Sequence, residues 1–146
     1  MAEKKISGLT AKGSNLEETD LLIISKSDGS GGYDTKSITG AELKNFSINT
    51  QTNTYTFVLT DANKLVELDH ASTKTFSIPL NSSVAFPIGT EIKLAQIGAG
   101  QLRIAALVGA TLNSSGGKTK IAAQYGVAQL IKRATDEWYL FGDITT

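Results

Sequence analysis

The residues that could perform chemistry in this chain are few and scattered. His70 is the only imidazole and there is no Cys, so a two-histidine metal site and a thiolate nucleophile are both excluded. Asp69 stands beside His70, but an isolated Asp-His pair at a strand end is typical of a solvated turn rather than of a general base. The sequence therefore predicts a non-enzymatic protein with no catalytic residues and no metal site.

Two glycine-containing segments have parts of nucleotide-binding motifs. Gly117-Lys118-Thr119 has the end of a phosphate-binding loop, but Leu112 stands where that loop needs its first Gly. Gly98-Ala99-Gly100 begins like a dinucleotide fingerprint, but Arg103 occupies the place of the third Gly. We predict a turn for the first segment, the loop of a bulged β-hairpin for the second, and no cofactor.

Charge and hydropathy narrow the range of partners. The fourteen basic and fourteen acidic residues cancel, and no stripe of Lys or Arg is present. Nucleic acids and anionic membranes require such a basic surface, so neither is an expected partner. No run approaches the roughly eighteen apolar residues of a membrane span, which argues against membrane insertion. The absence of Cys fits synthesis in a reducing cytoplasm.

The aromatic residues indicate either a core or a binding surface. In the segment 137–142, Trp138 and Leu140 share one face of a predicted strand, while Tyr139 and Phe141 share the other. A strand that is apolar on both faces is buried from two sides, centrally in a sandwich or at a subunit contact. We predict a subunit interface at Trp138, Tyr139, Leu140 and Phe141, and keep sugar stacking as the alternative.

Residues 1–46 differ in pattern from the rest. An apolar strand at 21–25, a Gly- and Ser-rich turn and a strand at 33–38 predict a hairpin. Thr39 precedes Glu42 at the spacing of a capping box, which predicts a short helix at 40–46. Isolated hairpins are marginal in water, so this segment must lean on another surface.

Short alternating apolar runs, separated by turns, fill the chain from residue 54 onward. We predict a polar linker at 47–53 and a β domain at 54–146, with later strands near 91–97, 101–107, 119–122, 126–133 and 137–142. No helix-length periodic segment lies between the runs. The pattern therefore predicts a mainly β protein, with an antiparallel β-sandwich or barrel-like C-terminal domain preceded by a small hairpin and a short helix.

Taken together, these segments resemble small structural proteins of tailed bacteriophage virions. The similarity to the attachment segment of phage fibre and decoration proteins is carried by Ile6-Ser7-Gly8-Leu9-Thr10, Asp20-Leu21-Leu22-Ile23-Ile24-Ser25, Tyr33-Asp34-Thr35-Lys36-Ser37-Ile38-Thr39 and Leu43. The similarity to a β module of phage tail and head fibres is carried by Tyr55-Thr56-Phe57, Asp61-Ala62-Asn63-Lys64-Leu65-Val66, Phe86-Pro87-Ile88-Gly89-Thr90, Gly98-Ala99-Gly100 and Glu137-Trp138-Tyr139-Leu140-Phe141-Gly142-Asp143.

The resemblance implies a homotrimeric virion component, made in the cytoplasm of the bacterial host, that docks on another capsid or tail protein. The short length favours a capsid decoration protein or head fibre, and the alternative is a short tail fibre that binds a host-surface glycan. The docking residues that we predict in the attachment segment are Ile6, Leu9, Leu22, Ile24, Tyr33, Ile38, Leu43 and Phe46.

Overall fold

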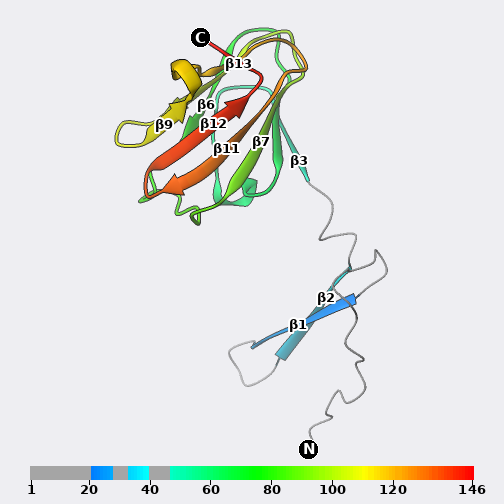
Figure 1. The fold of residues 1–146 in the computed structure, drawn as a ribbon. Coiled ribbons are helices and arrows are strands. Elements are labelled where there is room, and N and C mark those ends of the chain that lie inside the picture. The colour runs from blue at the N-terminus through cyan, green and yellow to red at the C-terminus, as the bar shows by residue number, and fades with distance from the viewer. Residues whose placement is uncertain (1–20, 28–32, 40–46) are drawn as a thin grey trace, which may run out of the picture. The chain divides into compact units, whose positions relative to one another are not determined.

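The structure is a computed structural model that describes residues 21–27, 33–39 and 47–146. The chain divides into two units, Met1–Asn45 and Phe46–Thr146, and each is considered by itself. Figure 1 shows the elements of both units.

The first unit contains the predicted hairpin. Strand β1 (Leu21–Ser27) pairs antiparallel with β2 (Tyr33–Thr39). Of the predicted docking residues, Leu22 lies opposite Ile38, while Ile24 lies opposite Lys36 and Tyr33 opposite Ser27. The predicted helix at 40–46 and the docking residues Ile6, Leu9, Leu43 and Phe46 lie outside the described residues.

The second unit is built from two sheets. The six-stranded sheet has the spatial order β3 (Ile48–Gln51), β5 (Leu65–Leu68), β7 (Glu91–Gln96), β11 (Val127–Ala134), β12 (Glu137–Gly142) and β9 (Thr111–Ser114). The five-stranded sheet has the order β13 (Ile144–Thr145), β10 (Lys120–Ile121), β8 (Leu102–Ala106), β6 (Lys74–Ile78) and β4 (Tyr55–Thr56). Two short 3-10 helices, η1 (Leu59–Asp61) and η2 (Ser115–Gly117), complete the unit.

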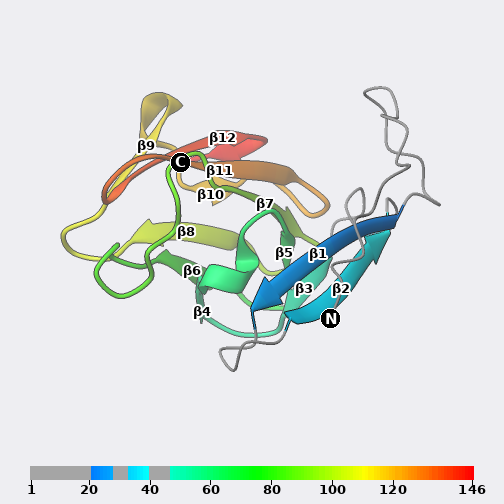
Figure 2. The ribbon, with the colours of Figure 1, turned by 90° about the horizontal axis from the view of Figure 1, so that it is seen from below.

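The core lies between these two sheets, as in a β-sandwich (Figure 2). Alternate residues of each strand point inward, and a fully buried Leu, Ile or Phe side chain contributes about 1.5–3 kcal/mol. The buried apolar residues come from both sheets and two loops: Phe57, Val66, Leu68, Phe76, Ile78, Phe86, Ile92, Leu94, Leu102, Ile104, Ile121, Ala128, Leu130, Trp138 and Leu140. The expectation of a mainly β protein is confirmed, although the sheets mix parallel with antiparallel pairs.

Three consecutive pairs of strands form a stack of β-arches, in which the chain leaves one sheet and enters the other. β3 leads to β4, β5 leads to β6, and β7 leads to β8. Accordingly β3, β5 and β7 run parallel in one sheet, and β4, β6 and β8 run parallel in the other. Parallel neighbours require crossovers, and here each crossover passes through the opposite sheet.

Main-chain contacts hold adjacent arches together. The N–H of Gly98 donates to Leu68 O at 3.0 Å, and the N–H of Gly100 donates to His70 O at 2.8 Å. A Cβ at Gly100 would lie 2.2 Å from Ser72 O, and a Cβ at Gly98 would lie 2.4 Å from His70 N. Both positions therefore need glycine for close backbone approach. The bulged hairpin predicted here is wrong, because β7 and β8 belong to different sheets.

The segment predicted as a linker, 47–53, contains β3 instead. The inward positions of this strand are Asn49 and Gln51, which stand in register with buried Val66 and Leu68 of β5. Because both residues are polar, β3 lacks the apolar alternation of its neighbours. β3 is the outermost strand on its side of the sheet. β3 belongs to the first β-arch of the stack, and no further arch within residues 47–146 covers it. Polar side chains are expected on such a terminal repeat, because its outer side faces water.

A hydrogen-bond network satisfies these polar residues. The carboxylate of Asp61, which is 1% exposed, accepts from Asn49 Nδ2 at 2.8 Å, from the Tyr55 hydroxyl at 2.8 Å and from the Val58 N–H at 2.9 Å. Gln51 Nε2 donates to Asn49 Oδ1 at 2.7 Å. These hydrogen bonds link β3, Tyr55 and η1 at the end of the stack. A polar network in which each group has a partner favours one conformation of the segment that contains it.

We expect the domain to lose stability at alkaline pH through Tyr55. Its pKa is raised from the ordinary value of 10.0, because burial disfavours the phenolate and because its hydroxyl donates to Asp61. The stabilising contribution is complete below that ordinary value and is lost as the pH rises through the folded-state pKa. Urea denaturation measured across this pH range should show a steeper loss for the wild type than for Tyr55→Phe. Equal slopes would contradict this role of Tyr55.

Candidate functional site

The outer face of the six-stranded sheet carries a row of side chains that crosses five strands. The row begins at the edge strand β3 and follows the register of the sheet as far as β12. It contains Ile48 of β3, Leu65 of β5, Lys93 of β7, Gln129 of β11 and Phe141 of β12. Alternation of side chains along each strand places these residues opposite the core. We call this row and the apolar residues beside it, Val127, Ile131 and Tyr139, the outer face.

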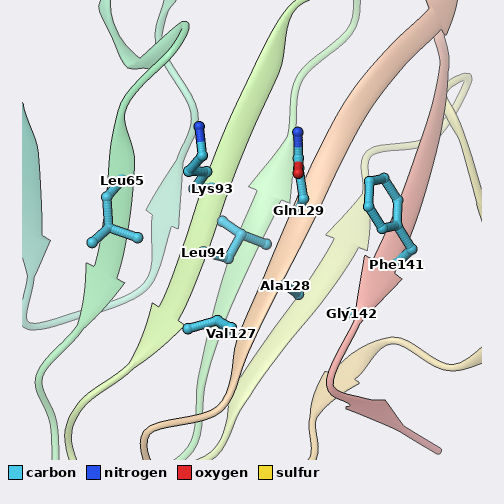
Figure 3. Close-up of a pocket in the computed structure, with 8 residues that line it drawn as sticks. All are labelled: Leu65, Lys93, Leu94, Val127, Ala128, Gln129, Phe141 and Gly142. Atoms are coloured by element: carbon cyan, nitrogen blue, oxygen red, sulfur yellow. The ribbon is translucent and has the colours of Figure 1, made fainter. Parts of the chain in front are cut away.

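A shallow groove runs along the middle of the outer face. It has a volume of about 370 Å³. Figure 3 shows Leu65 on one side of the groove and Phe141 on the other, with Lys93 and Gln129 between them. Gly142 also lines the groove, and a Cβ added there would come within 2.7 Å of Ala128 Cα. Gly142 also has a φ of +127°, which favours glycine.

The apolar side chains of the outer face are open to solvent, and the polar side chains of Lys93 and Gln129 lie among them. The exposed fractions are 62% for Ile48, 58% for Val127, 47% for Phe141 and 42% for Tyr139. Scattered exposed apolar residues are ordinary, but a contiguous patch on one sheet face marks an interaction site. The geometry therefore favours a surface that another molecule covers.

Charged groups at the margin of the outer face pair with their neighbours. Arg133 Nη1 donates to Glu137 Oε2 at 2.6 Å, and the Arg133 guanidinium lies 5.8 Å from the ring centre of Tyr139. The pKa of Arg133 is raised by its hydrogen bond to Glu137. Thr50 Oγ1 donates to Glu67 Oε1 at 2.6 Å. These pairs form a polar rim, as found around the apolar centre of protein interfaces.

A second hollow lies beside the first, at the β9 edge. Its volume is about 320 Å³, and its lining includes Asn113, Ser115, Tyr139 and Phe141. Phe141 lines both hollows and stands between them. The side chain of Phe141 is therefore the central exposed aromatic group of the outer face.

The four residues predicted as a subunit interface separate into two pairs. Trp138 and Leu140 are each only 2% exposed and belong to the core of their own chain, so they are corrected from interface to core residues. Tyr139 and Phe141 lie on the outer face. The period of two in a strand causes this separation, because β12 has one face on the core and one outside.

Sequence reasoning did not identify the other residues of the outer face. Ile48 falls in the segment predicted as a linker, and Lys93 and Gln129 are polar. The signal that could have found Val127 and Ile131 is their alternation with Ala128 and Leu130, which are buried. Their partnership with Leu65 depends on strand order, which no local pattern encodes.

The remaining residues singled out for chemistry have local roles. His70 Nδ1 accepts a hydrogen bond from the Ser72 N–H at 2.8 Å and thus closes the turn of an arch. Gly117 lies in η2 with a φ of +69°. The segment that has the end of a phosphate-binding loop is therefore a turn. Within residues 47–146, no three His, Cys, Asp or Glu residues are grouped so that they could hold a metal ion.

Comparisons with known proteins give no match: no family model, curated protein or solved structure corresponds to this chain. Among the described residues there is also no helix with the length and apolar character that crossing a membrane requires.

Proposed function

We propose that this protein is a non-enzymatic structural subunit of a tailed-phage virion, of the capsid decoration or head fibre type. It docks on another virion protein through residues 1–46 and associates with two further copies of itself through the outer face. The observation that carries the proposal is the outer face, where apolar side chains from β3, β11 and β12 are 42–62% exposed. Virion assignment rests on the sequence resemblance described above.

A second copy of the chain is the occupant that suits this surface. A stable protein interface buries about 800 Å² on each partner, and a row that spans five strands has the extent for such a contact. Burial contributes roughly 25 cal/mol for each Å² of apolar area removed from water. The outer face also carries both signs of charge, Glu67 and Glu91 beside Lys93, so identical copies can meet without net repulsion.

The arches and the start of β3 lie at opposite ends of the β domain. The chain enters the β domain at Ile48, the start of β3, and β3, β5 and β7 all run away from that end. The arches therefore lie at the opposite end of the domain, as Figure 1 shows. That end also carries Tyr125, which is 75% exposed.

Analytical ultracentrifugation of the full chain tests the proposal. We expect a trimer for the wild type and a monomer for the double variant Val127→Ser and Phe141→Ser, with the melting temperature of the individual domain nearly unchanged. The matched control is Val108→Ser, which removes a side chain that is 97% exposed but lies outside the outer face. A monomeric wild type, or equal dissociation by both kinds of variant, would contradict the proposal.

A specific observation favours one second candidate, a host-glycan-binding module of a short tail fibre. Phe141 offers a ring for stacking, and the polar side chains of Gln129 and Lys93 line the same groove. Sugar sites combine an apolar surface with a few convergent polar groups. Binding of a glycan by a monomeric wild type, lost in Gln129→Ala, would favour this candidate over the first.

A further inference from the structure

Within residues 47–146, Lys132 is the one fully buried side chain that carries a positive charge. It follows Ala128 and Leu130 on the inward side of β11, and it is 2% exposed. Its partner across the strands is Trp138, whose ring centre lies 6.0 Å from Lys132 Nζ. Lysine is almost never fully buried without a specific reason.

The contacts of Lys132 Nζ are neutral oxygen atoms. Nζ donates to Asn81 Oδ1 and, at 2.7 Å, to Phe86 O. Among the described residues, no carboxylate forms an ion pair with Lys132. A buried ammonium group without an anion is costly even when its protons have acceptors. The site would therefore be stabilised by any reaction that replaces the charge with a neutral group.

Asn81 is held against Lys132 from a different part of the chain. Its backbone N–H donates to Asp136 Oδ1 at 2.5 Å, in the turn between β11 and β12. Asn81 and Lys132 are 51 positions apart in the sequence. The fold itself thus brings an amine and a carboxamide together, which is the proximity that turns a slow bimolecular reaction into an intramolecular one.

We infer that Lys132 and Asn81 condense to form an intramolecular isopeptide bond. The lone pair of the Lys132 amine attacks Cγ of Asn81, a new Nζ–Cγ bond forms, and the Cγ–Nδ2 bond breaks. Of the three protons of the lysine ammonium, one stays on the new amide nitrogen and two pass to the Asn81 NH2 group, which leaves as an ammonium ion. The atoms and charges balance without an oxidant or another reactant.

The surroundings favour the amide product. Condensation removes the buried charge and leaves one N–H on Nζ that can still donate to Phe86 O. Phe86 and Trp138 pack edge to face at 5.4 Å beside the amine, and both are at most 3% exposed. Exclusion of water by such walls prevents competing hydrolysis. Asp136 is a positioning residue, because it contacts the backbone of Asn81 rather than the reacting atoms.

The bond would close a covalent loop between β11 and the segment that joins β6 to β7. Like a disulfide, it would restrict the unfolded chain. It would do so in a chain that has no Cys and would not depend on the redox state of the surroundings. The inference is independent of the proposed function, since it needs only the folded β domain.

Intact-mass spectrometry of the purified full chain tests the inference. We expect the wild type to be lighter than its sequence mass by about 17 Da, the mass of one ammonia, because a covalent modification changes the mass by a fixed increment. Proteolysis should then release a branched peptide that contains both Asn81 and Lys132. Lys132→Arg and Asn81→Ala should each have the full sequence mass.

Two further measurements keep the result clear. Asp136→Ala should retain both reacting residues but lose ammonia more slowly after synthesis, as followed by mass over time, with circular dichroism confirming the folded state. Lys132→Arg serves as the conservative variant, since it keeps a buried cation but has no reactive amine. A folded wild type that stays at its full sequence mass after prolonged incubation would overturn the inference.

Discussion

Replacing Gly100 with Ala lowers the free energy of unfolding by about 3 kcal/mol, the scale expected for overpacking at a rigid site. The added Cβ would lie 2.2 Å from Ser72 O and 2.6 Å from Ser72 N, so it meets main chain rather than a side chain that could rotate away. The two arches must then separate, and the hydrogen bond from Gly100 N–H to His70 O is lost with them. Urea denaturation at neutral pH measures the change.

Gly117→Ala is the matched control for this prediction. Gly117 has a φ of +69°, and a Cβ added there would meet no atom within 4 Å, so its substitution tests backbone conformation without crowding. We expect a loss of about 1 kcal/mol, the cost of a left-handed conformation for Ala. A loss at Gly100 no larger than that at Gly117 would show that the arches can move apart freely.

Replacing Asp61 with Ala should lower the free energy of unfolding by about 3 kcal/mol, because three partly buried donors lose their acceptor and each unsatisfied group costs about 1–3 kcal/mol when water cannot reach it. The three donors are Asn49 Nδ2, the Tyr55 hydroxyl and the Val58 N–H. Some of the loss is recovered where water reaches Asn49, which is only half-buried. Thermal and urea denaturation both report the change.

Asp69→Ala provides the comparison for Asp61. Asp69 is exposed and close to the second arch, and surface substitutions of this kind usually change stability by less than about 0.5 kcal/mol. A double-mutant cycle of Asp61→Ala with Tyr55→Phe should show coupling, because the two groups share a hydrogen bond. Additive effects in that cycle, or equal losses for Asp61 and Asp69, would remove the network as a source of stability.

The strands of this fold were readable where apolar residues alternate. The segment predicted near 137–142 forms β12 (Glu137–Gly142), and the one near 126–133 forms β11 (Val127–Ala134). Alternation reports a local property, the difference between the two faces of one strand. It also separated Trp138 from Tyr139 correctly, but it could not tell that Trp138 faces the chain's own core.

The β-arches could not be predicted from the sequence, because they depend on contacts between segments that are far apart in the chain. Gly98-Ala99-Gly100 has the composition of a hairpin loop, and a hairpin and an arch place the same demands on these residues locally. The difference lies in the backbone of His70 and Ser72, which comes to rest against both glycines. Strand β3 was hidden in the same way, since its polar Asn49 and Gln51 are explained only by Asp61 and Tyr55, which lie further along the chain.

The stacked arches also divide the domain into a rigid end and an adaptable end. At the arch end, the backbone of residues 98–100 lies directly against the backbone of residues 68–72. These contacts limit the length of the segments that connect the two sheets there. At the other end the chain returns through residues 57–64, 79–90 and 107–110, and the last of these turns exposes Val108 at 97%. Exposed loop tips of this kind accept inserted sequence. The fold therefore offers a site where a foreign peptide could be displayed next to residue 108 without disturbing the layers that define the domain.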